Sequence, residues 1–388
     1  KRTSYLVASD YMKKLIEHKL DGVPVQVDQR PDQLIQTVIS NTPSAPASIS
    51  LAVGSLVLPL ALHSEQDEKS TPMSVIQKIC QTALEYAWVE GDEVFRSQRE
   101  ITRATQASAF TLDNTMSEIE VEASTDNVKN KIIGSIFPSR LDTDQGTLLA
   151  SLSSEFPLDA GATLTIKLRV RDPQGGSNRI SGKDFVTSLV AGTHYNMSAF
   201  SQSGGSDMNA YLVPTVSAGG NTVDVQVQNT GSVRGYISQM EIFGNGIYQY
   251  DPIDITVESG AGDKVITYDL YYLDDYYIGK DHITAMHKRT SVEHLKVNKV
   301  SYNPDFSLTM MNYFINYGIG DRITLQEFVT ALNDDFTINK ERIEITSTQR
   351  LKVEYPDPEW ASGLYNFFTV QDAVLGEIDN AGIVLSPY

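Results

Sequence analysis

The side chains that could do chemistry in this chain are six histidines, one cysteine and many carboxylates. His282, His287 and His294 lie closest together, at spacings of five and seven residues. A metal site of the H-E-x-x-H kind needs two histidines four residues apart on one helix face, and neither spacing supplies that. We therefore expect these histidines to lie on a solvated helix face, and we predict no metal site.

Paired carboxylates could act as general acid and base, as they do in glycoside hydrolases. The chain has adjacent pairs at Asp274-Asp275 and Asp334-Asp335. A glycosidase needs two carboxyl groups about 5–10 Å apart across a groove, and adjacency in sequence is no evidence for that arrangement. Because Asp274-Asp275 precedes a helix-like segment, we predict that this pair caps the helix.

The other reactive residue types also fit structural roles. Cys80 falls on the apolar face of an expected helix, so we predict a small core residue. The glycine pairs 175–176, 204–205 and 219–220 follow strand-like segments instead of opening helices, which indicates turns and not phosphate loops. Asp207 lacks the regular acidic spacing of a calcium loop. We predict no catalytic residue, no cofactor and no metal.

Composition limits the class of protein. The 388 residues are enough for about two to four domains, and 41% hydrophobic residues are incompatible with a disordered chain. The formal net charge of -18 argues against a surface that neutralises phosphates, so we expect no specific nucleic-acid binding. An acidic surface usually serves solubility.

The clearest structural unit is the segment 71–99. Thr71 can cap a helix that begins at Pro72, whose missing N–H costs nothing there. Apolar residues then recur at helical spacing: Met73, Ile76, Ile79, Cys80, Ala83 and Leu84. Strands at 87–89 and 94–96 flank Glu90–Glu93, which favours a hairpin turn.

Other helices are expected after Ser9-Asp10, from Pro31, and after Asp275. The uncharged run 47–62 is shorter than the roughly 20 residues that a membrane-spanning helix needs. Its β-branched residues and its Gly and Pro breaks favour two short buried strands.

Two regions have strand-like patterns. From about Phe156 to Gly244, period-2 alternation at 162–171 and 223–228 predicts a β-sandwich of about 90 residues. Turn clusters are expected there at 172–176, 202–207 and 217–221. Residues 295–388 are expected to form a small barrel or sandwich with little helix. The strands expected in this second region are 295–300, 307–311, 322–325, 342–346, 350–353 and 367–370.

Several of these segments resemble a known family. The order of helix, aromatic strand, acidic glycine turn and VFRSQR in 71–99 is similar to a segment of minor tail and tail-hub proteins of long-tailed bacteriophages. Further phrases resemble that family in the same order: Phe110–Asp113, Ile119–Val121, Lys129–Ile132, Ser238–Ile247 and Gly318–Leu325. Together these phrases span nearly all of the chain.

The patterns and the resemblance together predict an α+β, β-rich multidomain fold, with hub-like α+β and small β-barrel parts and an inserted β-sandwich. The expected domains are a hub-like α+β region at 1–150, an Ig-like sandwich at 151–245, a return of the hub-like region with a strand and a helix at 246–320, and a β-barrel-like part at 321–388.

The resemblance implies a structural virion component of a phage tail tip or baseplate hub that joins the tail tube to host-recognition parts, and no enzyme. It implies a ring-like homo-oligomer, with three copies expected and six as the alternative. Further partners would be the tail tube, distal tail, tape measure and fibre proteins. In such a ring, an acidic lumen would repel DNA.

Two other classes remain open. One is a carbohydrate-binding adhesin that recognises host surface glycans, and the other is a glycan-degrading enzyme whose carboxylates the sequence cannot pair. Large amphipathic rings suit both subunit contacts and sugar stacking. Seven tyrosines crowd into a short stretch and are candidates for such contacts: Tyr248, Tyr250, Tyr268, Tyr271, Tyr272, Tyr276 and Tyr277.

Overall fold

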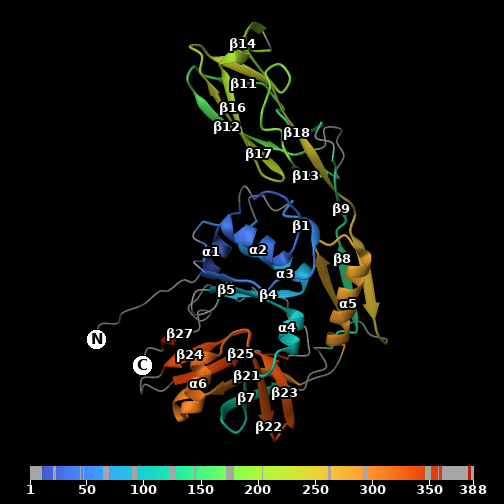
Figure 1. The fold of residues 1–388 in the computed structure, drawn as a ribbon, viewed down its shortest axis with the longest axis vertical. Coiled ribbons are helices and arrows are strands. Elements are labelled where there is room, and N and C mark those ends of the chain that lie inside the picture. Colours follow the sequence, from blue (N-terminus) through green and yellow to red (C-terminus); the bar gives the residue numbers. More distant parts are fainter. Residues whose placement is uncertain are drawn as a thin grey trace, which may run out of the picture.

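The computed structural model describes residues 11–20, 23–43, 45–46, 48–63, 70–89, 94–122, 128–143, 146–171, 179–202, 204–260, 264–291, 295–345, 351–356, 358–360 and 383–385. The predicted fold class is confirmed: the molecule is α+β and β-rich, with several separate sheets and few helices (Figure 1). None of the sheets in the described part closes into a barrel.

The first part of the chain packs helices onto two small sheets. Its elements are α1 (Tyr11–Glu17), β1 (Gln26–Gln29), α2 (Pro31–Ser40), β2 (Ser48–Ser50), β3 (Leu58–Ala61), α3 (Pro72–Ala83), β4 (Glu85–Val89), β5 (Val94–Arg99) and α4 (Glu100–Thr105). Strand β1 pairs with β3, and β5 lies between β2 and β4. Fully buried side chains of α2 and α3, including Leu34 and Ile76, belong to one hydrophobic cluster.

The predicted cap and core face of α3 are confirmed. The Ser74 N–H donates to the Thr71 hydroxyl at 3.2 Å, and the Thr71 N–H donates to the Ser74 hydroxyl at 3.0 Å. The helix ends at Leu84, whose φ of 55° lies in the left-handed region. Strands β4 and β5 pair antiparallel as expected, and the predicted turn at 90–93 lies outside the described residues.

The uncharged run 47–62 forms two strands, but only one of them is buried. Strand β3 lies in the core, whereas β2 is an edge strand that pairs in parallel with β5. The expectation that both strands are buried was therefore wrong for β2, in which Ile49 is partly buried and both serines are exposed. Val53 in the loop after β2 is also exposed. No helix in the described part is long and apolar enough to cross a membrane.

The upper part of Figure 1 is built from strands. They are β9 (Ser139–Leu141), β10 (Thr147–Ser151), β11 (Phe156–Leu158), β12 (Thr163–Arg169), β13 (Arg179–Lys183), β14 (Tyr195–Phe200), β15 (Gly204–Asp207), β16 (Leu212–Ala218), β17 (Thr222–Asn229) and β18 (Gly235–Gln249), with the 3-10 turn η2 (Asn209–Tyr211). The three-stranded sheet β12-β17-β16 shares one hydrophobic cluster with strands paired to β18. The predicted alternation is confirmed on β17, where Val223, Val225 and Val227 are fully buried. On β12 it fails at Leu164, which is exposed near the start of the strand.

Strand β18 is the long spine of this part. Over 15 residues it pairs antiparallel with β9, β10, β11, β13 and β14. It runs through residue 245, where the sequence suggested a domain boundary. Thr147 pairs with Gly244, so the two ends of the 147–244 segment lie side by side. A separately expressed sandwich would therefore have to include β10 and the whole of β18.

The turn expected at 202–207 was wrong for its second half. Residues Gly204–Asp207 form β15, which pairs with β14 through Ser198 with Asp207 and Phe200 with Gly204. Strand pairing here overrides the weak strand propensity of glycine, serine and aspartate. The turn expected at 172–176 lies outside the described residues.

A three-stranded sheet and a helix connect the upper part to the rest of the molecule. Strand β8 (Lys131–Ile136) lies between β19 (Ile253–Glu258) and β20 (Val265–Leu270), and α5 (Tyr276–Thr290) packs on this sheet. A Cβ at Gly134 would lie 2.2 Å from Ile283 Cδ1, so the helix reaches its position only because residue 134 is glycine.

The C-terminal part consists of two open sheets and one helix at the lower end of Figure 1. Its elements are β6 (Phe110–Leu112), β7 (Met116–Glu122), β21 (Lys296–Tyr302), η3 (Pro304–Phe306), α6 (Leu308–Asn316), β22 (Arg322–Glu327), β23 (Leu332–Thr337), β24 (Arg342–Ile345), β25 (Leu351–Pro356), β26 (Glu359–Trp360) and β27 (Ile383–Leu385). The sheet orders are β27-β24-β25-β21-β7 and β26-β23-β22-β6.

The strand expected at 307–311 was wrong, because these residues cap and begin α6. The Ser307 hydroxyl accepts a hydrogen bond from the Met310 N–H at 3.2 Å. A short apolar run does not distinguish a strand from a helix by its period, and here the cap decides. Strand β23 was not anticipated, and the strand expected at 367–370 lies outside the described residues.

Candidate functional site

The histidines singled out in the sequence do not form a site. His287 is buried, and its Nε2 lies 3.2 Å from the carbonyl oxygen of Asn130, so the expected solvated position was wrong for this residue. Burial lowers the pKa of His282, although a hydrogen bond with the Thr82 backbone acts in the opposite direction. His294 lies outside the described residues. Among the residues that the structure places, no group of three or more potential metal ligands occurs.

The acidic pairs have structural partners. The Asp275 carboxylate accepts hydrogen bonds from the N–H groups of Tyr277 at 2.7 Å and Ile278 at 3.0 Å, which confirms the predicted helix cap. Burial raises the pKa of its neighbour Asp274. Asp335 forms an ion pair with Arg322 across β22 and β23, with an N–O distance of 2.7 Å. One member of each pair therefore has a structural role, Asp275 as a helix cap and Asp335 as a partner of Arg322.

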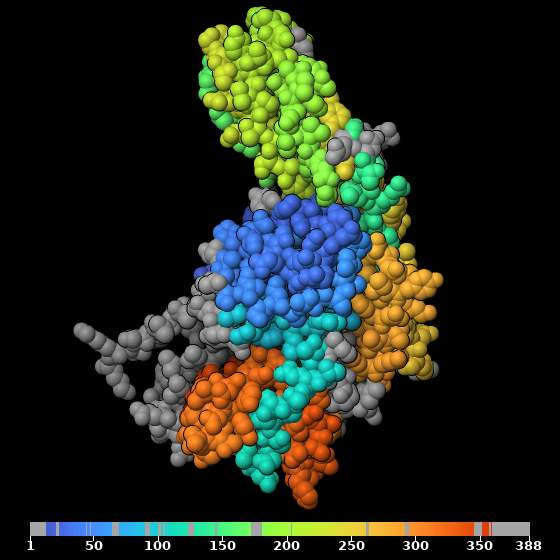
Figure 2. All heavy atoms as spheres, in the orientation of Figure 1, coloured from blue at the N-terminus to red at the C-terminus, as the bar shows by residue number. Residues whose placement is uncertain are grey.

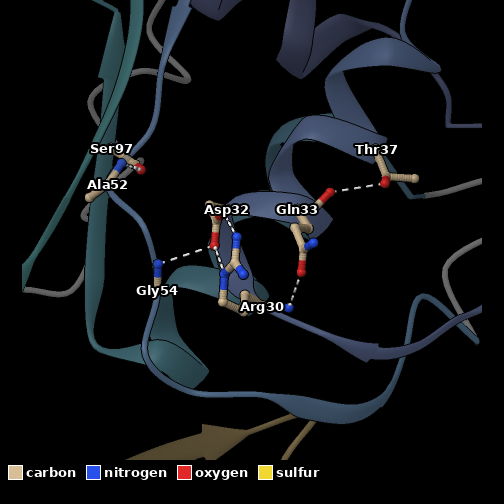
Figure 3. Close-up of polar contacts among 7 residues, drawn as sticks. All are labelled: Arg30, Asp32, Gln33, Thr37, Ala52, Gly54 and Ser97. Atoms are coloured by element: carbon tan, nitrogen blue, oxygen red, sulfur yellow. Dashed lines mark hydrogen bonds and ion pairs between the residues drawn. The ribbon is translucent and has the colours of Figure 1, made fainter.

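A polar cluster at the start of α2 was not foreseen (Figure 3). Arg30 donates from Nε and Nη2 to the Asp32 carboxylate, at 3.0 and 2.9 Å. The same carboxylate accepts a hydrogen bond from the Gly54 N–H at 3.1 Å, and the Ala52 N–H donates to Ser97 Oγ at 3.1 Å. These contacts tie the loop that follows β2 to both α2 and β5.

The chemistry of this cluster favours a structural role over a catalytic one, and we call the contacts of Asp32 with Arg30 and Gly54 the Arg30–Asp32 latch. Burial alone would raise the pKa of Asp32, but the hydrogen bonds from Arg30 and Gly54 hold it below its ordinary value. The carboxylate is thus charged and already engaged by donors. Pro31 leaves little room there, since a Cβ at Gly54 would lie 2.6 Å from Pro31 Cδ. In the sequence, Pro31-Asp32 indicated only the start of a helix.

Two buried carboxyl groups have strongly shifted pKa values. Burial raises the pKa of Glu85 to about 7, with a further contribution from the charge of Asp32. Burial likewise raises the pKa of Glu341 to about 7. The thiol of Cys80 is fully buried, and burial together with Glu85 raises its pKa well above the ordinary value. A thiol in that state is a poor nucleophile, so the prediction of a core role for Cys80 is confirmed.

The most informative feature is a junction between the first and the C-terminal parts. Gly320, with φ of +96°, presses its backbone against the indole of Trp88, where a Cβ would lie 2.5 Å from Cζ2. Nearby, the Arg103 guanidinium stacks on the ring of Tyr86 at 3.7 Å and donates to the Asn339 side chain. The two parts are thus fitted closely to each other.

Segments that lie far apart in the sequence also pair in the C-terminal part and beside β8. Phe110–Leu112 pairs in parallel with Ile323–Leu325, and Ile119 on β7 pairs with Val300 on β21. The side chain of Asn130, just before β8, accepts a hydrogen bond from the Lys264 N–H at 3.1 Å. Several of the phrases singled out in the sequence are therefore joined in one scaffold.

The C-terminal part exposes two apolar surfaces. The first, which we call the hairpin tip, consists of Phe328 and Val329 between β22 and β23, with exposed fractions of 96% and 88%. The second, the α6 face, consists of Phe306, Leu308 and Ile315, of which Leu308 is 79% exposed. Figure 2 shows the hairpin projecting at the lower end of the molecule and α6 at its side, with β7 between them.

The tyrosine-rich stretch is divided between core and surface. Tyr268 and Tyr272 are buried, whereas Tyr250, Tyr276 and Tyr277 are exposed. Tyr276 and Tyr277 lie edge to face, with ring centroids 5.8 Å apart. A subunit contact through the exposed rings stays a prediction.

The comparisons with known proteins give similarity in fold only. No family model matches the chain, and no curated protein matches it in sequence. A solved tail protein from Neisseria meningitidis MC58 is similar over 91% of this chain and 74% of its own, with 8% identity and a TM-score of 0.44. A 43 kDa tail protein of prophage MuSo2 from Shewanella oneidensis is similar over 91% of this chain and 72% of its own, with 7% identity and a TM-score of 0.46.

Proposed function

We propose that this protein is a structural component of a phage tail, located in the virion at the tail tip or baseplate hub, where it joins the tail tube to host-recognition parts. The observation that carries the proposal is the junction: Gly320, from one phrase of the tail-hub resemblance, packs on Trp88, from another. If the two phrases belong to one tail-hub scaffold, they are expected to lie in contact, and they do.

Two further observations support a structural role without catalysis. The titratable groups with the largest pKa shifts, such as Glu85 and Glu341, lie in the interior of the fold, and the acidic pairs cap a helix or bridge strands. In contrast, large apolar side chains are displayed at the surface, which is typical of proteins that bind other proteins. We propose as partners further copies of the chain in a ring, three being the expected number, and the tail tube, distal tail, tape measure and fibre proteins.

The test uses the phage or prophage that encodes the chain. Purified particles should contain the protein by mass spectrometry, and gold-labelled antibody should mark the tail tip in electron micrographs. Particles made without the gene should lack a complete tail tip, and supplying the gene in trans should restore it. Complete, infective tails that lack the protein would contradict the proposal.

A second candidate function, recognition of a host glycan, is favoured by one observation. Tyr211 is exposed on the strand-rich upper part, and an exposed aromatic ring can stack on a sugar. The full chain should then bind members of a glycan array, and Tyr211→Ala should reduce that binding at least tenfold. An array without any bound glycan would remove this candidate.

A further inference from the structure

The turn that carries the hairpin tip is held by hydrogen bonds to the Glu327 side chain. The Glu327 carboxylate accepts hydrogen bonds from the Val329 N–H at 2.9 Å, the Thr330 N–H at 2.6 Å and the Thr330 hydroxyl at 2.7 Å. Ala331 then reverses the chain with φ of +57°. Phe328 and Val329 are therefore presented to solvent by an ordered turn, and little conformational entropy would be lost if they were buried by a partner.

The α6 face lies on the same part of the molecule as the hairpin tip. Met310 is the residue of α6 that is buried, and the ring of Tyr313 stacks on Phe110 at 4.3 Å, which fixes one side of the helix on the core. On the other side Leu308 and Ile315 stay exposed. The exposed Asn312 lies between these two residues on the same side, so this side of α6 combines apolar side chains with an amide. It has no cover among the residues that the structure places.

Charge indicates what covers both surfaces. The chain carries a net charge of -18, so two copies repel each other across most of their surfaces. The sequence from Phe306 to Gly320 contains no charged residue, and neither does the sequence from Phe328 to Asn333. Two acidic residues flank these stretches, Asp305 before the first and Glu327 before the second, and the hydrogen bonds of the turn already engage the Glu327 carboxylate. A second copy therefore meets few charges at the point of contact.

We propose that the hairpin tip of one copy docks on the α6 face of a second copy. The two surfaces differ in shape and lie at different places on one chain, so the contact is head-to-tail, and repeated contacts generate a closed ring when the rotation closes. The proposal deepens the proposed function, on which it rests for the closed assembly, by assigning the surfaces that join neighbouring copies.

The test uses two full-length variants that each lose one surface. The tip variant carries Phe328→Ser and Val329→Ser, and the face variant carries Leu308→Asp and Ile315→Asp. All four positions are exposed, so both variants should keep the circular dichroism spectrum of the wild type. Phe200→Ser, an exposed phenylalanine on the upper part, is the matched control.

Sedimentation velocity gives the decisive masses. The wild type and the Phe200→Ser control should form one discrete assembly, and each surface variant alone should be monomeric. An equal mixture of the two variants should form a two-chain species and nothing larger, because one intact tip meets one intact face.

Surface variants that assemble like the wild type, or a mixture that stays monomeric, would overturn the proposal and leave the tail role intact. A monomeric wild type would overturn the contact and the ring. Absence of the protein from purified particles would instead reject the tail role while the contact between copies still held.

Discussion

Helices α3 and α6 are built alike but end up in opposite environments. Each begins at a hydroxyl cap, Thr71 for α3 and Ser307 for α6, and each is rich in apolar residues. Helix α3 buries Pro72, Met73, Val75, Ile76, Ile79, Cys80 and Thr82, whereas α6 buries Met310. An apolar pattern therefore predicts a helix but does not say which molecule covers it.

The largest loss of stability is expected when a buried side chain of α3 is shortened, compared with an exposed one of α6. Ile76→Ala removes a fully buried side chain and should cost about 2–5 kcal/mol, whereas Ile315→Ala changes an exposed one and should stay within about 0.5 kcal/mol. Urea unfolding followed by tryptophan fluorescence measures both. Similar losses for the two variants would mean that the α6 face is covered within a single chain.

The second prediction concerns the pH dependence of the part that carries α6. Folding raises the pKa of Glu341 from 4.5 to about 7, so its proton is bound more tightly in the folded state. This contribution to stability is complete below pH 4.5 and is lost as the pH rises through about 7, by up to ~3 kcal/mol. The carboxyl interacts electrostatically with Tyr302 and Tyr355, and a Cβ at Gly318 would lie 3.9 Å from its Oε2.

Glu341→Gln should therefore flatten the decline of stability between pH 4.5 and 8. Urea midpoints across that range measure the effect, and Glu120→Gln, at an exposed position on β7, is the control that should leave the decline in place. An unchanged pH profile in Glu341→Gln would show that this carboxyl does not cause the decline.

A smaller effect is expected at the junction that joins the two regions. Gly320→Ala forces a Cβ toward Trp88 at a residue with φ of +96°, and should cost about 1–3 kcal/mol. Gly161→Ala is a matched control, because its φ of +69° adds left-handed strain of about 1–2 kcal/mol but nothing lies within 4 Å of the new Cβ. Trp88 fluorescence should shift only in Gly320→Ala, and a shift in both variants would argue against the contact.

The smallest expected effects come from the caps. Thr71→Ala and Ser307→Ala should each cost about 1 kcal/mol of local helix stability. Because α6 packs with few side chains, the loss there should appear as faster amide exchange in 308–316 without a change in the global midpoint. A lowered global midpoint in Ser307→Ala would show that α6 unfolds together with the whole part.

The sequence predicted elements whose signals are local. For α3 it supplied a cap, a proline and helical spacing, and for β17 a strict alternation of valines. It failed for α6, where a short apolar run fits either period, and for β15, whose glycines form a strand only because β14 supplies the pairing. The long β18 depends on five partner strands, which no local pattern encodes.

The surfaces were less predictable than the fold. Phe328 and Val329 follow β22 directly and could be taken for its continuation, and the hydrogen bonds to Glu327 show that they form a turn. The Arg30–Asp32 latch depends on Gly54, which is distant in sequence. The exposure of the tyrosines likewise follows from which side of α5 and its sheet each ring occupies.

Hydroxyl-radical footprinting can show whether the α6 face is covered by a second copy, because it measures side-chain exposure in the assembled protein. Assembled wild type is compared with the Phe328→Ser, Val329→Ser variant, and Phe200 serves as the internal reference that should react equally in both. We predict that Leu308 and Ile315 are protected in the assembly and reactive in the variant, while Ile76 is protected in both. Equal oxidation of Leu308 and Ile315 in the two samples would contradict the account.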